Sequence, residues 1–109
     1  PAYSGVTCSI LHGAMPDGVI LCHSAGREAV HGYAAFDLPP LEEAVDLYER
    51  LAAPVAPTEL VGAALNTADL DPDAARVATE AVAADLGVPC ADPVRDGADD
   101  LAEAIVAWA

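Results

Sequence analysis

Residues 60–91 read LVGAALNTADLDPDAARVATEAVAADLGVPCA, and this stretch decides the fold class. Leu60–Leu65 is continuously apolar, as expected for a strand of a parallel sheet that helices cover on both faces. Asp71-Pro72 is typical of a helix start, and Gly87 is a residue that can end the helix in the left-handed conformation. Another short strand is predicted at Val88–Ala91. A strand, a helix and a second strand in this order indicate a parallel βαβ unit.

The elements on either side continue the alternation. The sequence predicts helices over Tyr3–Ala14 and Leu41–Ala52, a strand over Val19–Cys22 and a loop over Ser24–Tyr33. Downstream, Asp96 is expected to cap a last helix whose inward residues are Leu101, Ala102, Ile105 and Val106. The order helix-strand-helix-strand-helix-strand-helix predicts an α/β domain, a three-layer parallel sheet with flanking helices.

The predicted sheet is small for its class. Doubly wound domains usually carry about five or six strands, and the leading helix here has no strand before it. We therefore expect residues 1–109 to be the C-terminal half of an α/β domain, with its first strands missing upstream of Pro1.

The charge of the chain excludes several partners. Its 18 acidic residues face only 4 basic ones, all arginine, for a formal net charge of -14. Nucleic acids and anionic membranes need clustered positive charge, so neither is expected as a partner. No apolar run approaches the roughly 20 residues of a membrane span. An acidic surface without lysine is typical of a halophilic source, and a GC-rich genome would also favour arginine over lysine.

The number and spacing of the cysteines indicate a cellular compartment but no metal-binding role. Cys8, Cys22 and Cys90 are an odd number without C-x-x-C spacing, which favours a reducing cytoplasm over a disulfide framework. We predict no metal site: Cys8 and His12 lie four residues apart, but no second close pair completes a ligand set. The cysteines are interpreted as small buried hydrophobic residues.

Ligands of open α/β sheets bind outside the carboxyl ends of the strands. The first such segment, residues 22–27, contains His23, which can act as acid or base near neutral pH, and Arg27, whose planar fork suits a carboxylate or phosphate. The structural alternative is a histidine bonded to loop backbone and a surface pair between Arg27 and Glu28. Residue types alone leave both interpretations open.

The other two segments follow the strands of the opening stretch. Asn66 and Asp69 are spaced like the amide and carboxylate of the Asn-Lys-x-Asp turn that reads a purine edge, although Thr67 replaces the lysine. The alternative is that both side chains satisfy turn backbone. Asp92 and Arg95 occupy the third strand end. No glycine-rich phosphate loop occurs in the chain.

A set of motifs spread over most of the chain resembles the C-terminal part of a two-domain family, domain-of-unknown-function sixteen-eleven. The motifs are Pro1-Ala2-Tyr3-Ser4-Gly5-Val6-Thr7, Leu11-His12-Gly13, Pro16-Asp17, Leu21-Cys22-His23, Gly26-Arg27, Leu65-Asn66-Thr67, Val88-Pro89 and Asp92-Pro93-Val94-Arg95.

The resemblance implies an N-terminal Rossmann-like domain followed by a P-loop domain of the dethiobiotin-synthetase type, whose phosphate loop would lie upstream of Pro1. The family is loosely described as NAD-dependent epimerase/dehydratase and includes proteins described as D-glutamate N-acetyltransferases. By this resemblance, residues at matching motif positions become ligand contacts: Tyr3, Ser4, His23, Arg27, Asn66, Asp92 and Arg95.

The resulting hypothesis is a segment of an enzyme that transfers an acetyl group from acetyl-CoA to the amine of an acidic amino acid such as D-glutamate. His23 is the expected base or proton relay, and Tyr3, Ser4 and Arg27 are expected to bind substrate. The expected cofactor-binding residues are Asn66, Asp69, Asp92 and Arg95, with acetyl-CoA or ATP as the cofactor.

Two alternatives remain, an ATP-dependent ligase or nucleotide-binding regulatory module, and a structural half-domain that pairs through its sheet edge. The expected partners are a small-molecule substrate, the missing Rossmann-like domain and P-loop half in cis, and further copies in a homo-oligomer. The isolated chain is expected to be inactive.

Overall fold

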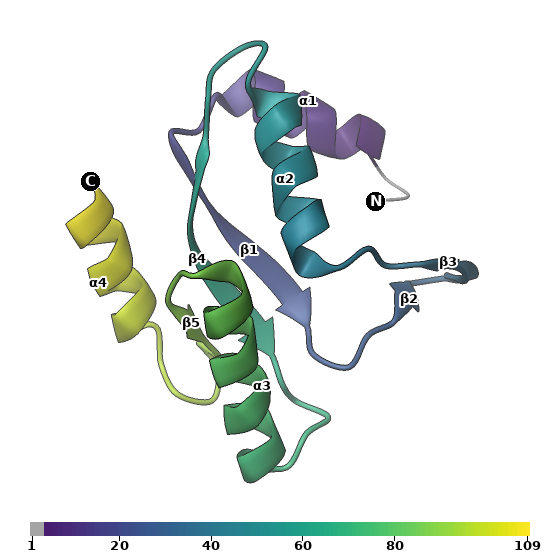
Figure 1. The fold of residues 1–109 in the computed structure, drawn as a ribbon, viewed down its shortest axis with the longest axis vertical. Coiled ribbons are helices and arrows are strands. Elements are labelled where there is room, and N and C mark those ends of the chain that lie inside the picture. The colour runs from purple at the N-terminus through teal and green to yellow at the C-terminus, as the bar shows by residue number, and fades with distance from the viewer. Residues whose placement is uncertain (1–3) are drawn as a thin grey trace. The chain divides into compact units, whose positions relative to one another are not determined.

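The structure is a computed structural model in which residues 4–109 are described. Along the chain it forms α1 (Ser4–Ala14), β1 (Gly18–Ser24), β2 (Ala29–Val30), β3 (Tyr33–Asp37), α2 (Leu41–Ala52), β4 (Glu59–Asn66), α3 (Pro72–Leu86), β5 (Cys90–Ala91) and α4 (Asp99–Trp108) (Figure 1). These elements belong to two compact units. The first contains the described residues up to Val19 and Gly26–Glu59, and the second contains Ile20–Ala25 and Leu60–Ala109.

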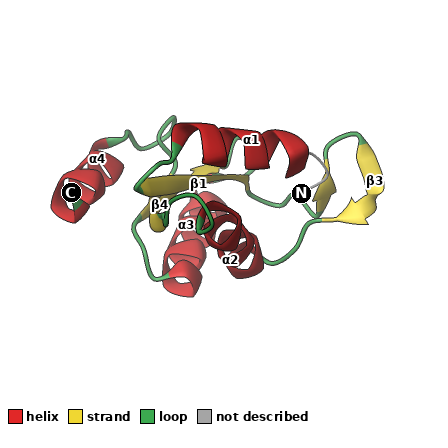
Figure 2. Ribbon diagram, turned by 90° about the horizontal axis from the view of Figure 1, so that it is seen from above, coloured by secondary structure: helices red, strands yellow, loops and turns green. Residues whose placement is uncertain are grey.

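The second unit is built on the main sheet, whose strand order is β1-β4-β5. Strands β4 and β5 run in parallel, with Ala63 opposite Cys90. At the ends of β1 and β4, the Ala25 N–H donates to the Asn66 carbonyl over 3.0 Å. Seen from above, α3 lies on one side of the strand layer (Figure 2). The predicted α/β fold, a parallel sheet with flanking helices, is confirmed.

Helix α3 begins and ends where its sequence predicts. The Asp71 carboxylate accepts the Ala74 N–H over 2.9 Å, and Pro72 occupies the first turn, where a missing N–H costs nothing. At the other end Gly87 has φ 67°, and its N–H donates to the Ala83 carbonyl over 2.9 Å. Local chemistry alone therefore sets both ends of this helix.

Gly62 of β4 allows the core of the second unit to pack closely. A Cβ at this position would lie 3.1 Å from Cδ2 of Leu101, and 3.2 Å from both Cδ1 of Ile20 and the Pro89 carbonyl oxygen. The carbonyl belongs to backbone and cannot turn aside. The buried hydrophobic residues of this unit are Leu21, Val61, Ala63, Leu65, Ala75, Ala91 and Leu101.

Helix α4 differs from its sequence prediction at both ends. It begins at Asp99, and Ala98 holds the cap position without a side-chain hydrogen bond, so Asp96 is not its cap. The Asp96 N–H donates to the Asp92 carbonyl within the turn that follows β5. Leu101 is buried as expected, but Ala102 is exposed, and Ile105 and Val106 are 45% and 77% exposed. The strand that α4 contacts, β5, is only two residues long and offers little surface to cover a helix.

In the first unit, α1 packs against α2. His12, in the last turn of α1, donates from Nε2 to the Leu51 carbonyl of α2 over 2.5 Å. The described hydrophobic residues buried in this unit are Leu11, Ala44 and Ala52. A side chain therefore joins the two helices near the C-terminal ends of both.

The segment predicted as a loop over Ser24–Tyr33 contains β2, and the chain returns as β3 to make an antiparallel hairpin. The Leu38 N–H donates to the Glu28 carbonyl over 2.8 Å, and Gly32 has φ 80° at the turn. All five residues of β3 are exposed, so this strand has no buried face to produce an alternating pattern. The predicted loop is therefore correct for residues 25–28 and 31–32 and wrong for Ala29–Val30, a strand too short to show a period.

Among residues 4–109, no helix combines the length and the apolar character needed to cross a bilayer.

Candidate functional site at the ends of β4 and β5

Two loops of the second unit leave the carboxyl ends of neighbouring parallel strands, residues 67–71 after β4 and 92–98 after β5. They are joined by Asp92 and Thr67, whose residues are 3% and 1% exposed. Oδ2 of Asp92 accepts the Thr67 N–H over 2.9 Å and also accepts the Thr67 hydroxyl in a short hydrogen bond. A buried carboxylate thus holds the start of one loop against the start of the other.

The second oxygen of Asp92 organises its own loop. Oδ1 accepts the Val94 N–H over 3.0 Å and the Arg95 N–H over 3.1 Å. These bonds, with those from Thr67, stabilise the charged form. The Thr67 hydroxyl has the largest effect, and together they outweigh the cost of burial and lower the pKa of Asp92 from 3.8 to about 2. The carboxylate is therefore charged at neutral pH although its residue is almost entirely buried.

Arg95 closes the contact from the other side. Its Nε donates to the Thr67 hydroxyl oxygen over 3.1 Å, and its Nη2 donates to the carbonyls of Thr67 and Leu70, each over 2.9 Å. A guanidinium presents its donors in a fixed planar fork, so these three contacts fix its orientation. Nη1 has no hydrogen-bond partner among the described residues of the second unit. We refer to Thr67, Asp92 and Arg95 as the loop clamp.

The predicted base-reading residues lie on the outside of the loop clamp. Asn66 is exposed at the end of β4, and its Oδ1 accepts the Ala68 N–H over 3.0 Å. The structural alternative is thus confirmed for the amide oxygen, which satisfies turn backbone. The Asn66 Nδ2 group keeps its two N–H donors, and Asp69 is exposed three residues further on. The turn therefore offers amide donors and a carboxylate acceptor to solvent.

The residues predicted for catalysis and substrate binding are divided between the two units. His23 is half-buried near the end of β1, within the second unit. Arg27 is exposed, belongs to the first unit, and follows Gly26, which has φ 80°. Ser4 is the first residue of α1, and Tyr3 lies outside the described residues. Within the second unit, the structure therefore brings Asn66, Asp92 and Arg95 to the same pair of loops.

The cysteines differ from the expectation that they would be buried. Cys22 is exposed, whereas Cys8 and Cys90 are of intermediate exposure. Neighbouring side chains of a strand point to opposite faces, and Leu21, beside Cys22, takes the buried one. Burial raises the pKa of the Cys90 thiol, so it remains protonated at neutral pH.

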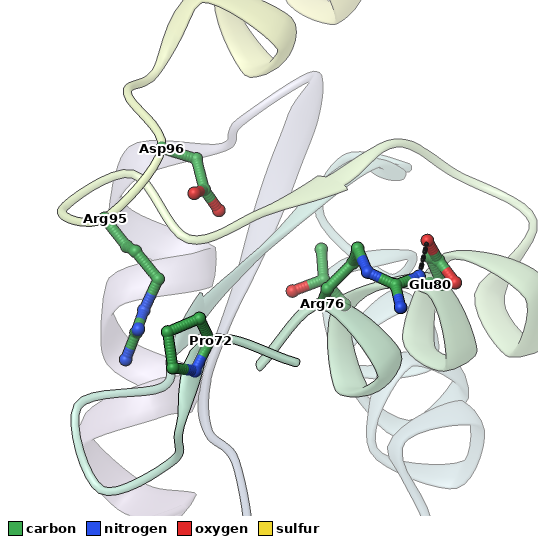
Figure 3. A pocket seen from close by; sticks show the side chains of 6 residues that line it. Pro72, Arg76, Glu80, Arg95 and Asp96 are labelled. Carbon is green, nitrogen blue, oxygen red and sulfur yellow. Dashed lines mark hydrogen bonds and ion pairs between the residues drawn. The ribbon is translucent and has the colours of Figure 1, made fainter. Parts of the chain in front are cut away.

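Sequence reasoning missed a hollow beside the loop clamp. It has a volume of about 520 Å³ and is lined by Pro72, Arg76, Thr79, Glu80, Arg95 and Asp96, all of the second unit (Figure 3). Arg76 lies one helical turn after the start of α3 and pairs with Glu80 over 2.9 Å. In the sequence, Arg76 and Glu80 have the four-residue spacing of an ordinary surface ion pair in a helix, so nothing marked Arg76 as a candidate site residue.

The second unit thus combines a parallel sheet with polar loops at its carboxyl edge, the edge at which open α/β sheets generally bind ligands. The sequence profile of the DUF1611 family, a domain of unknown function described as a P-loop domain, matches residues 1–102. The chain belongs to this family, as its motifs predicted.

Two curated relatives are named D-glutamate N-acetyltransferase. The protein from Pseudoalteromonas sp. is 32% identical over 93% of this chain, and the one from Tritonibacter scottomollicae is 37% identical over 97%. A crystal structure of a DUF1611 family protein from Anabaena variabilis superposes with a TM-score of 0.87 at 37% identity, over 92% of this chain. The chain spans 31% and 32% of the two relatives' lengths and 30% of the solved protein.

Proposed function

We propose that this chain provides the donor-binding part of an N-acetyltransferase that moves the acetyl group of acetyl-CoA to the amine of an acidic amino acid such as D-glutamate. The observation that carries the proposal is the loop clamp, which holds the Asn66–Asp69 turn rigidly at the carboxyl edge of the sheet. The names of the relatives support the reaction type.

The turn suits the adenine end of acetyl-CoA. An adenine edge offers ring-nitrogen acceptors beside an amino group that donates. The Nδ2 group of Asn66 donates to a ring nitrogen, and the carboxylate of Asp69 accepts from the amino group. Because three side chains outside this contact already fix the turn, binding costs little ordering of the loop.

The proposed reaction requires removal of a proton from the substrate ammonium. The free amine then attacks the thioester carbonyl carbon, and collapse of the tetrahedral adduct breaks the C–S bond. The amide nitrogen loses its second proton as the CoA thiolate gains one, and the proton first taken from the ammonium is released to solvent, so protons and charge balance. In this proposal His23 takes the proton from the ammonium, and Arg27 binds a substrate carboxylate together with Tyr3 and Ser4.

The test is acetyl transfer by the whole protein, with acetyl-CoA and D-glutamate as substrates. Replacing Asn66 or Asp69 by alanine is expected to raise the KM for acetyl-CoA about tenfold, with little change in kcat. The matched control is Asp85→Ala, which removes an exposed carboxylate at the far end of α3. Equal KM values in all three variants would remove the turn from the donor site.

The role of His23 has a separate test. His23→Ala is expected to lower kcat by roughly 10²–10⁴-fold and to remove the corresponding limb of the pH–rate profile. Near-normal turnover with an unchanged profile would show that this side chain carries no proton.

The P-loop description of the family favours a second candidate, an ATP-dependent ligase or a nucleotide-binding regulatory module on the same scaffold. The adenine contact described above serves ATP equally well. ATP hydrolysis by the whole protein without any need for acetyl-CoA would favour this candidate, and acetyl transfer without ATP would exclude it.

A further inference from the structure

The hollow beside the loop clamp gathers the positive charge of the second unit. The four basic residues of the chain are arginines, and the two in this unit, Arg76 and Arg95, both line the hollow. The rest of the unit is rich in carboxylates, in a chain whose formal net charge is -14. An anionic group that binds to this unit is therefore attracted to the two arginines of the hollow.

The two arginines are prepared differently. The loop clamp holds the Arg95 fork through Nε and Nη2, which leaves Nη1 as a donor already fixed in place. Arg76 is tied only to Glu80, in a pair whose side chains are 62% and 64% exposed. Such an exposed pair within a helix contributes little to stability, so a dianion can draw Arg76 away from it.

Two carboxylates, Glu80 and Asp96, also line the hollow and balance the charge of the two arginines. A free anion therefore gains little by entering. An anion delivered by a ligand that already binds the neighbouring turn avoids this limit, because its effective concentration at the hollow is high. Arg95 and Arg76 lie on opposite sides of Pro72 (Figure 3), whose ring provides an apolar surface between them.

We propose that this hollow binds the ribose 3′-phosphate of coenzyme A, with Arg76 as the residue that recognises it and Arg95 as the fixed second donor. This inference rests on the proposed function, because it requires a CoA donor whose adenine occupies the Asn66–Asp69 turn. A phosphate monoester carries close to two negative charges at neutral pH, which matches two guanidinium groups. ATP has no phosphate at this position, so the hollow distinguishes the two cofactors.

The experiment measures calorimetric binding of CoA, 3′-dephospho-CoA and ATP to the whole protein. The unmodified protein is expected to bind CoA about tenfold more tightly than dephospho-CoA, and Arg76→Ala to abolish that preference while leaving dephospho-CoA affinity unchanged. Glu80→Gln, which removes the competing carboxylate, is expected to retain or increase the preference. The control is Arg50→Ala, which breaks the equally spaced exposed pair with Asp46 in α2.

The outcomes separate this inference from the function on which it rests. If CoA and dephospho-CoA bind the unmodified protein equally, or if Arg76→Ala weakens both alike, the 3′-phosphate assignment is overturned while the acetyltransferase proposal stands. If Arg76→Ala weakens ATP as much as CoA, Arg76 recognises a polyphosphate and the assignment also fails. Absence of any CoA binding overturns both proposals. Circular dichroism is the check that the variants, which change exposed side chains, remain folded.

Discussion

The loop after β1 and the loops after β4 and β5 all follow parallel strands, yet they use their polar residues differently. After β1, Arg27 is exposed, and the chain continues into a hairpin whose second strand has no buried residue. After β4 and β5, Thr67 and Asp92 are buried, and Arg95 donates to backbone carbonyls of the other loop. Asp92 and Arg95 are the chemically conspicuous residues at these two strand ends, and their hydrogen bonds hold one loop against the other. A conspicuous charged residue at a strand end can therefore serve to fix a loop.

The largest effect is expected when the hydrogen bonds around Asp92, between the loops after β4 and β5, are removed. Asp92→Ala removes the acceptor of four hydrogen bonds, two from Thr67 and two from the backbone of residues 94 and 95. Leaving these donors unpaired is expected to lower the free energy of unfolding by about 3–4 kcal/mol in urea denaturation. Asp69→Ala, at an exposed position, is the control and should change it by less than about 0.5 kcal/mol. Similar losses for both variants would contradict the loop clamp.

The pH dependence of stability tests the same carboxylate without mutation. The pKa of Asp92 is lowered to about 2 in the folded state, so its contribution is complete above the ordinary value of 3.8 and is lost as the pH falls toward 2. This amounts to about 2 kcal/mol. Urea denaturation between pH 5 and pH 2 should show the loss, and the Asp92→Ala variant should lack that part of it. A variant with the same slope as the unmodified protein would assign the effect to other groups.

Thr67→Val removes one hydroxyl of the loop clamp at nearly constant side-chain volume. The buried hydroxyl donates to Asp92 and accepts from Nε of Arg95, and its loss is expected to cost about 1–2 kcal/mol in the same assay. The control is Thr79→Val, because the Thr79 hydroxyl donates only to the Ala75 carbonyl of its own helix. A Thr79 effect as large as that of Thr67 would show that hydroxyl loss has no special cost at the clamp.

The smallest effect is expected in the exposed hairpin of β2 and β3. Phe36 is 60% exposed and meets Tyr33 edge to face, with ring centroids 6.2 Å apart. Phe36→Ala is expected to lower the free energy of unfolding by at most about 0.5–1 kcal/mol, while amide exchange accelerates in the hairpin. A global loss of 3 kcal/mol or more would mean that the hairpin is as integral as the loop clamp.

How much of the fold could be predicted depended on how local its causes are. Asp71, Pro72 and Gly87 determine the ends of α3 through contacts within a few residues, so the sequence predicted this helix correctly. The hairpin was missed because β2 has two residues and β3 has no buried face, which leaves no period to detect. Ile105 and Val106 were placed inward by helical spacing, but burial requires a neighbouring surface, and β5 is too short to supply it.

The family, the α/β class and the strand ends at which polar residues gather could all be predicted from the sequence. This was possible because apolar runs, caps and turn residues act over a few positions. Which of these polar residues contact one another became clear only from the three-dimensional fold. Thr67 and Asp92 are 25 residues apart and meet because two parallel strands end side by side, as do Arg76 and Arg95 around one hollow. Contacts between distant segments depend on packing in three dimensions, and no local pattern in the sequence encodes them.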